Sequence, residues 1–382
     1  MKLEDSLTDS FQVAITLPES GIQSHASNLL VLPSSDTLCT WFSGTEEGKG
    51  DISIFISRLN QGDAQWSSPE KVSNNPGRSD QNPMLFRTPG GALWLLFTSQ
   101  DGGNQDTAVI KRRISKDNGK TWGPEVQLFE NTGLFIRQEM LITDAQEWVL
   151  PIFHCVIKND GNPWDGSYDY SAVLVTNDEG KTWKEYKVPD SLGCVHMNIQ
   201  KLKDGSYVAF YRSRWADKIY RSESTDAKHW TAPEKTELPN NNSSIQFVTL
   251  QNGDLVMAFN KASRDDATVR RTSLYSDGIE DKNVTSNDDQ PRAFWGAPRA
   301  PMTVAVSEDG GKTWPYQRSV AEGDGFALTN DSKNKKNREF SYPSIKQSQD
   351  GDLLLTFTYF RQKIALLKFN EEWIKTGKKE AN

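Results

Sequence analysis

The sequence predicts an all-β chain folded as a six-bladed β-propeller. Three observations predict this fold: octads that recur along the chain, hairpin patterns between them, and a composition suited to short strands and turns. The 382 residues include 12 Trp, 17 Phe, 10 Tyr, 27 Gly and 17 Pro, while only 36% are apolar. This mixture is typical of short strands joined by many turns. Closed all-β folds of this length occur as one unit, so the length is compatible with a single domain.

The octads share the form S/T-x-D-x-G-x-T-W and occur at 115–122, 176–183 and 307–314, with looser copies that end at Trp66 and Trp230. In each octad the Asp can accept hydrogen bonds from the following backbone N–H groups, and the Gly supplies a positive φ. The Trp offers a large apolar surface to the next strand. We therefore interpret the octads as hairpin turns and expect their Asp residues to be structural. Their spacing of about 40 to 60 residues indicates propeller blades.

Strand–turn–strand patterns fill the segments between the octads, as in NIQKLKDGSYVAFY and FVTLQNGDLVMAF. The strand at 11–18 lies outside these patterns, and we expect it to complete the last blade, because closing the ring removes exposed sheet edges. The polar segment 264–298 is interpreted as an insertion, either disordered or presenting Phe294 and Trp295 to a sugar. The prediction is a single domain over 1–382, with blades at about 22–66, 79–122, 134–183, 193–230, 243–314 and 340–374.

The charge and the termini limit the classes of partner and the compartment. The net charge of −7 disfavours nucleic acid and anionic membranes, because both require clustered Lys and Arg. No apolar window of about 18 residues occurs, so we expect no membrane span and a soluble protein. The N-terminus MKLEDSLTDS lacks the pattern of a signal peptide, which leaves a cytoplasmic protein or a mature secreted or periplasmic form open.

The cysteines and acidic loops give no sign of a cofactor. Cys39, Cys155 and Cys194 lie far apart without a CxxC pair, and we expect them to be buried free thiols. No metal site is predicted, because no loop shows the ordered oxygen spacing of a Ca²⁺ site. We predict no cofactor and leave the oligomeric state open.

The octads and repeated hairpins resemble the Asp-box repeats of the sialidase (neuraminidase) superfamily, more closely its bacterial and fungal BNR-repeat branch, over nearly the whole chain. The resemblance implies a sialidase-like propeller and an exo-acting glycosidase on an acidic glycan. Sialidases hold the substrate carboxylate with three arginines, use a tyrosine nucleophile assisted by a glutamate, and use an aspartate as general acid/base.

In a propeller of this type, the inner-strand starts and the loops from each second strand to the third converge on one face, opposite the octads. The inner-strand starts supply Gln23, His25, Gln81, Asn82, Arg137, Glu139, His196, Asn198, Gln246 and Tyr342. The loops supply Glu46, Glu47, Asp51, His154, Arg212, Arg214, Asn260 and Arg299.

The resemblance implies specific roles for some of these residues. Tyr342 falls where the nucleophile is expected, and Glu47, with Asp51 as second choice, falls near the place of the acid. Arginine suits a carboxylate because its fork offers two parallel charge-assisted donors. The remaining candidates for binding the substrate are Arg212, Arg214, Arg299, Arg137, Gln81, Asn82 and His196.

The sequence departs from the family at two places. The family's first arginine, within an R-I-P motif, is replaced by the stretch Gln23–Ala26, which contains His25. The glutamate that assists the tyrosine should fall near Cys194–His196, and Glu139, one blade earlier, is a candidate substitute. An altered pocket predicts an altered substrate.

Three functions therefore stay open. The first is a retaining exo-glycosidase that removes an acidic terminal sugar, sialic acid being the family's default, with tyrosine the exception to the two-carboxylate rule. The second is a polysaccharide lyase that cleaves next to a uronic acid by β-elimination, with roles for His25, Tyr342, Gln81 and Arg137. The third is a non-catalytic carbohydrate-binding propeller, since Asp boxes also occur in such proteins.

Overall fold

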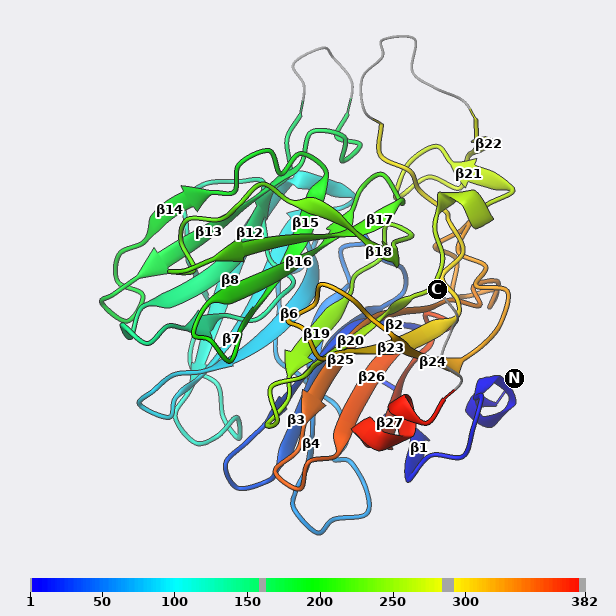
Figure 1. Cartoon of the computed structure of the whole chain (residues 1–382). Coiled ribbons are helices and arrows are strands. Elements are labelled where there is room, and N and C mark those ends of the chain that lie inside the picture. The colour runs from blue at the N-terminus through cyan, green and yellow to red at the C-terminus, as the bar shows by residue number, and fades with distance from the viewer. Residues whose placement is uncertain (1, 158–162, 284–291, 378–382) are drawn as a thin grey trace.

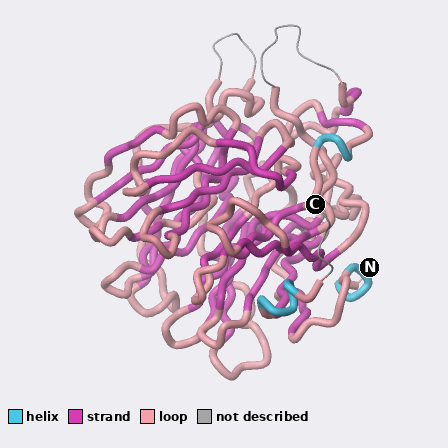
Figure 2. Tube along the Cα trace, in the orientation of Figure 1, coloured by secondary structure: helices cyan, strands magenta, loops and turns pink. Residues whose placement is uncertain are grey.

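Six antiparallel sheets follow one another along the chain and surround a central axis (Figures 1 and 2). The computed structural model describes residues 2–157, 163–283 and 292–377. Strands dominate these residues, and the short helices described are η1 (Leu3–Ser6), η2 (Arg264–Asp266) and α1 (Glu371–Lys375). The six-bladed β-propeller predicted from the octads is confirmed. None of the helices in the described part of the chain is long and apolar enough to cross a membrane.

Each sheet runs from an inner strand near the axis to an outer strand at the rim. From the axis outward, the first three sheets are β2 (Gln23–Val31), β3 (Thr37–Gly44), β4 (Ser53–Leu59) and β5 (Glu70–Lys71); β6 (Ser79–Arg87), β7 (Leu93–Asp101), β8 (Asn104–Ser115) and β9 (Val126–Gln127); and β10 (Leu134–Phe135) with β11 (Leu141–Ile142), β12 (Trp148–His154), β13 (Tyr170–Thr176) and β14 (Lys184–Lys187). The last three are β15 (Cys194–Lys201), β16 (Tyr207–Ser213), β17 (Lys218–Ser224) and β18 (Glu234–Pro239); β19 (Gln246–Thr249), β20 (Leu255–Asn260), β23 (Met302–Ser307) and β24 (Tyr316–Ala321); and β25 (Phe340–Gln347), β26 (Leu353–Tyr359), β27 (Lys363–Phe369) and β1 (Val13–Thr16).

The sixth sheet combines both ends of the chain. β1 pairs with β27 in an antiparallel register that runs from Val13 opposite Lys368 to Thr16 opposite Ala365. The inner strand β25 in turn contacts β2 of the first sheet. Sheet 6 and sheet 1 are therefore neighbours, and the ring is closed without a free inner edge. The assignment of the whole chain to a single domain, with the blade boundaries expected from the sequence, stays a prediction.

The octads form the turns between the third and fourth strands. In the first full octad, Asp117 Oδ1 accepts hydrogen bonds from the backbone N–H groups of Lys120 and Thr121 at 3.1 and 2.9 Å. The Thr121 hydroxyl and these N–H groups hold the pKa of the Asp117 carboxyl well below its usual range. Arg58 and Arg221, on the third strands of their sheets, donate to a backbone carbonyl in the octad of the next blade. The octads thus fix turns and brace neighbouring blades.

The segment between β20 and β23 carries a hairpin of its own. Its strands are β21 (Val269–Arg271) and β22 (Ile279–Asp281), which form a two-stranded sheet separate from the six blade sheets (Figure 1). Phe294 and Trp295 are only 4% and 3% exposed, so the expectation that they form an open platform for a sugar is wrong. Both pack into apolar clusters with neighbouring loops. The alternative of disorder falls partly on residues 284–291, which lie outside the described residues.

Candidate functional site

Four inner strands bulge where they begin, at the face opposite the octads. The pairing of β2, β6, β15 and β25 with their second strands shifts register at this point. One residue in each bulge has a positive φ, and these are Ala26 (58°), Asn82 (48°), His196 (55°) and Tyr342 (52°). None is a glycine, so each backbone is held in a region that side chains normally avoid. Bulges of this kind redirect side chains and are frequent beside active sites.

Tyr342 lies among three arginines that come from three other blades. Arg212, on β16, donates from Nη1 to the Tyr342 hydroxyl oxygen at 2.7 Å. The guanidinium carbons of Arg137, Arg212 and Arg299 lie 5.3, 5.7 and 5.7 Å from the centre of the Tyr342 ring. Tyr342 itself is 7% exposed. The structure therefore brings together four residues that the sequence placed on one face.

Two buried histidines lie beside Tyr342. The ring of His25 is 4.2 Å from that of Tyr342 between centroids, and the ring of His196 is 5.8 Å away. Burial and then the surrounding guanidinium groups lower the pKa of both histidines well below 6.5. Both rings are therefore neutral at neutral pH. His25 Nδ1 is hydrogen-bonded to the Thr358 hydroxyl at 2.8 Å. Nε2 is therefore the ring nitrogen that remains available for another partner.

A chain of buried ion pairs includes Glu47, the residue that the sequence favoured as the general acid. Arg299 Nη1 lies 3.2 Å from Glu339 Oε1, and Arg361 Nε donates to the same oxygen at 2.9 Å. Arg361 also pairs with Glu47. Burial alone would raise the pKa of Glu339, but Arg299 and Arg361 outweigh it and lower the pKa. Glu47 is thus held in a buried ion pair with Arg361.

Sequence reasoning missed Glu339 and Arg361. Arg361 follows β26 and so lies in a loop between a second and a third strand, one of the two classes of position that were expected to converge. Glu339 immediately precedes β25, three residues before Tyr342. The positional rule that selected Tyr342 applied equally to these residues and would have found them.

The other carboxylate candidates have partners of their own. Asp51 lies on an exposed part of its loop and accepts from the Thr45 backbone N–H at 2.9 Å and from the Thr45 hydroxyl at 2.8 Å. Glu139 pairs with Lys346 and accepts from Asn28 Nδ2 at 3.0 Å. Asn28 and Lys346 lie further along their inner strands than the bulges. Glu139 therefore braces the inner strands.

Arg214 and Arg212 are two residues apart, but their surroundings differ. Arg214 forms a buried ion pair with Asp169, with Nη2 at 2.6 Å and Nε at 3.0 Å from Oδ2. Trp164 Nε1 donates to the other oxygen of Asp169 at 2.9 Å. The rings of Trp164 and Trp295 lie 5.4 and 5.2 Å from the Arg214 guanidinium. The charge of Arg214 is therefore already balanced by Asp169. Arg212, in contrast, donates hydrogen bonds to the neutral side chains of Asn242 and Tyr342.

Unpartnered polar atoms concentrate around Tyr342. Gln81 Nε2 donates to the Ser79 hydroxyl at 3.0 Å, but its Oε1 has no protein partner among the described residues. Buried polar groups are almost always hydrogen-bonded, so such atoms indicate a place for water or a ligand. Those on the residues expected at this face include Gln81 Oε1, Asn82 Oδ1, His25 Nε2, His196 Nδ1, Arg212 Nη2, Nε and Nη1 of Arg137, Gln23 Oε1 and Asn260 Oδ1.

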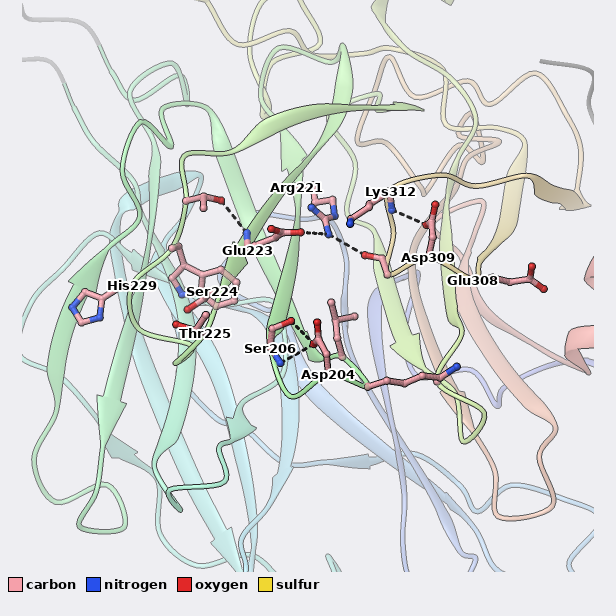
Figure 3. Close-up of a pocket in the computed structure, with 16 residues that line it drawn as sticks. Asp204, Ser206, Arg221, Glu223, Ser224, Thr225, His229, Glu308, Asp309 and Lys312 are labelled. Carbon is pink, nitrogen blue, oxygen red and sulfur yellow. Dashed lines mark hydrogen bonds and ion pairs between the residues drawn. The ribbon is translucent and has the colours of Figure 1, made fainter.

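A hollow of about 770 Å³ between the fourth and fifth blades is the alternative to the Tyr342 face as a candidate site (Figure 3). It lies at the octad side, and several of its charged residues already have protein partners. Arg221 Nη2 donates to Glu223 at 2.7 Å and to the Gly310 carbonyl at 3.1 Å, and the Ser206 hydroxyl donates to Asp204 at 2.6 Å. We therefore place the candidate site at the Tyr342 face. Within the described ranges, no cluster of His, Cys, Asp or Glu is arranged to hold a metal ion.

The sequence matches the family described as BNR repeat-like domain over residues 35–355. The chain belongs to the BNR-repeat family. The resemblance that the octads indicated is thereby confirmed. No curated protein matches the chain.

Solved structures similar to this BNR-repeat protein include several sialidases. The Hadza microbial sialidase Hz136 is 14% identical, with a TM-score of 0.65 over 92% of this chain and 66% of its own. The intramolecular trans-sialidase from Ruminococcus gnavus is 13% identical, with a TM-score of 0.65 over 97% of this chain and 99% of its own. A protein of unknown function from Dyadobacter fermentans is 15% identical, with a TM-score of 0.67 over 94% of this chain and 98% of its own. At these identities the likeness shows the fold alone.

The site of this BNR-repeat protein is suited to an anion. Burial lowers the pKa of Arg212 to about 9 and that of Arg137 to about 10, because a buried charge without a counter-ion is disfavoured. Both guanidinium groups also retain unpartnered N–H donors. A bound carboxylate would satisfy those donors and neutralise the charge at once.

Proposed function

We propose that this BNR-repeat protein is an exo-acting glycosidase of sialidase type, which removes an acidic terminal sugar from a glycan. The observation that carries the proposal is the 2.7 Å hydrogen bond from Arg212 Nη1 to the Tyr342 hydroxyl oxygen. A guanidinium donor stabilises the phenolate, which is the nucleophilic form of a tyrosine. Arg137 and Arg299 add positive charge beside the same ring.

The substrate carboxylate would be held by Arg212 and Arg137, with Arg299 at the more exposed side of the site. The unpartnered donors of Arg212 and Arg137 support this role. The place of the family's first arginine is taken by Gln23, whose Nε2 donates to the Ser332 hydroxyl at 3.0 Å. A neutral amide there favours a carboxylate that is oriented differently from that of sialic acid, so we include uronic acids among the substrates.

In the proposed reaction, Tyr342 attacks the anomeric carbon and a carboxylic acid protonates the leaving oxygen. Water then hydrolyses the glycosyl–tyrosine bond with the same carboxylate as base, so that configuration is retained. The carboxylate of Glu47 is already occupied by its ion pair with Arg361. We therefore assign the acid/base role to Asp51, the second choice from the sequence.

A lyase is the second candidate, and one observation favours it. His25 is neutral, its Nε2 is unpartnered, and its ring lies 4.2 Å from that of Tyr342. β-Elimination needs a base for the α-proton and a neutralised carboxylate, and a neutral imidazole beside arginines can supply both.

Aryl sialosides and aryl uronosides distinguish these functions. A glycosidase releases the aryl alcohol and a saturated sugar, whereas a lyase acting on an acidic polysaccharide produces an unsaturated uronate that absorbs ultraviolet light. Methyl esters of the same substrates are the matched controls, because they lack the charge that the arginines would bind. Equal turnover of acid and ester would refute a carboxylate clamp. Binding of acidic sugars without any turnover would leave the carbohydrate-binding function.

A further inference from the structure

The hairpin between β20 and β23 crosses the candidate site. Its tip carries Tyr275, whose hydroxyl oxygen accepts hydrogen bonds from Gln100 Nε2 and Gln105 Nε2, both at 3.1 Å. The hairpin belongs to the fifth blade, and the two glutamines belong to β7 and β8 of the second. In a ring of six blades, the second and the fifth are opposite each other. The tip must therefore span the face of the propeller to reach these partners.

The tip is packed closely where it arrives. A Cβ atom added to Gly103 would lie 2.9 Å from the Tyr275 ring, and one added to Gly48 would lie 3.1 Å from it. Burial raises the pKa of the Tyr275 phenol, with the charge of Glu47 as the next cause. Leu274 joins an apolar cluster with Phe135 and other residues of the third blade. The tip is thus held by the first, second and third blades together.

The base of the hairpin is tied to the site from the other side. Arg271 Nη1 donates to Asn330 Oδ1 at 3.4 Å, and Gln23 Nε2 donates to the carbonyl of the same Asn330 at 3.2 Å. Burial lowers the pKa of Arg271 to about 10, and the charges of Arg361 and Arg299 are the next causes. The hairpin therefore lies against the ion-pair chain that holds Arg299.

We propose that the hairpin tip Leu274–Tyr275 is a specificity element that restricts the site to one terminal acidic sugar and excludes internal sugars of a polysaccharide. This inference rests on the proposed function. A glycan chain that continued on both sides of the bound sugar would have to cross a hairpin anchored on opposite blades. Arg212, which is 1% exposed, and His25, which is fully buried, are both shielded from solvent on this face.

Two glycines provide a matched pair of variants. Gly103→Ala displaces the Tyr275 ring without removing any group, because its new Cβ meets that ring. Gly90→Ala is the control, since its Cβ would meet nothing closer than the Thr88 hydroxyl at 4.0 Å. Neither glycine has a positive φ, so the added methyl causes no backbone strain. Tyr275→Phe, which removes the hydroxyl that accepts from Gln100 and Gln105, is a milder third variant.

The first readout is independent of carbohydrate. Cys155 is a buried free thiol in the same apolar cluster as Leu274, whereas Cys39 belongs to a different cluster. The rate of alkylation of each by iodoacetamide is followed by mass spectrometry of the peptides. We expect Cys155 to react at least tenfold faster in Gly103→Ala than in Gly90→Ala, with Cys39 unchanged. Equal rates at Cys155 would show that Tyr275 does not hold the hairpin down, and would overturn the proposal.

The second readout is binding, measured by calorimetry with two oligosaccharides. One carries a glucuronic acid only at its non-reducing end, and the other carries it only at an internal position. We expect the wild-type protein and Gly90→Ala to prefer the terminal form at least tenfold, and Gly103→Ala and Tyr275→Phe to lose part of that preference. Equal preference in all four proteins overturns the specificity role. Absence of binding of either oligosaccharide, repeated with sialyl oligosaccharides, overturns the proposed function instead.

Discussion

Arg212 and Tyr342 are in direct contact, with Nη1 of the arginine 2.7 Å from the phenol oxygen. They belong to the fourth and sixth sheets and are 130 residues apart in sequence. The contact depends on two local features. A bulge at the start of β25 holds Tyr342 at a φ of 52°, and Asn242 Oδ1 accepts from Arg212 Nε at 2.7 Å, which fixes the guanidinium plane.

Replacing Tyr342 by Phe should abolish the nucleophile and leave the binding arginines in place. We expect kcat on aryl glycosides of acidic sugars to fall by at least about 100-fold, the scale of losing one positioned catalytic group, with KM changed little. Tyr359→Phe is the control, because it removes a phenol hydroxyl that bonds to Ser6 and Lys2 at the N-terminus. Full turnover by Tyr342→Phe would exclude the tyrosine as nucleophile.

Replacing Arg212 by Lys should weaken the hold on the carboxylate. A lysine offers one point charge instead of a planar fork, and it can serve either the phenol or the substrate. Loss of a charge-assisted hydrogen bond costs about 1.5–3 kcal/mol, so KM for acidic substrates should rise roughly 10- to 100-fold. Arg221→Lys, at the octad side, is the matched control. A comparable rise in KM for the methyl esters would show that Arg212 does not act on the substrate's charge.

The convergence of Tyr342 with Arg212 and Arg299 followed from the sequence, because blade repeats fix which positions share a face. The different surroundings of Arg212 and Arg214 could not be predicted from the sequence. Both were assigned to loops between a second and a third strand, and only the fold shows that Asp169, from the third blade, forms an ion pair with Arg214. Ion pairs between blades depend on the reach of side chains across an interface, which strand periodicity does not describe.

The position of Tyr275 across the site could not be predicted from the sequence either. The segment 264–298 contains no repeat, and its contacts with Gln100 and Gln105 join parts of the chain about 170 residues apart. Its composition indicated only a polar insertion. Local patterns predict elements that repeat, whereas an insertion is placed by contacts that have no counterpart elsewhere in the chain.

His25→Asn should distinguish the two enzymatic functions. If His25 is the base of a lyase, the variant loses nearly all elimination activity, whereas a glycosidase that relies on Tyr342 retains measurable turnover. Because burial and Arg361 hold the pKa of His25 well below 6.5, wild-type activity should persist as pH falls below 6.5. The measurement is a pH–rate profile of both proteins. An acid limb near pH 6.5 that disappears in His25→Asn would contradict a neutral His25.

Glu339→Gln should destabilise the fold because it leaves Arg299 without its partner and Arg361 with Glu47 alone. Breaking a buried ion pair costs about 3–5 kcal/mol, to be measured by urea unfolding at pH 7. The exposed Glu322→Gln is the control.

The pH dependence of this loss follows from the direction of the pKa shift. Burial would raise the pKa of Glu339, but Arg299 and Arg361 outweigh it, so the folded-state pKa lies below the ordinary value of 4.5. The ionised carboxylate therefore contributes its full stabilisation above pH 4.5, and that contribution is lost as pH falls through the folded-state pKa. The difference in unfolding free energy between wild type and Glu339→Gln should be constant from pH 7 to about 5 and shrink at lower pH. A difference that grew on acidification would mean that Glu339 is protonated in the folded protein at neutral pH, and the ion-pair chain to Arg299 would then not exist.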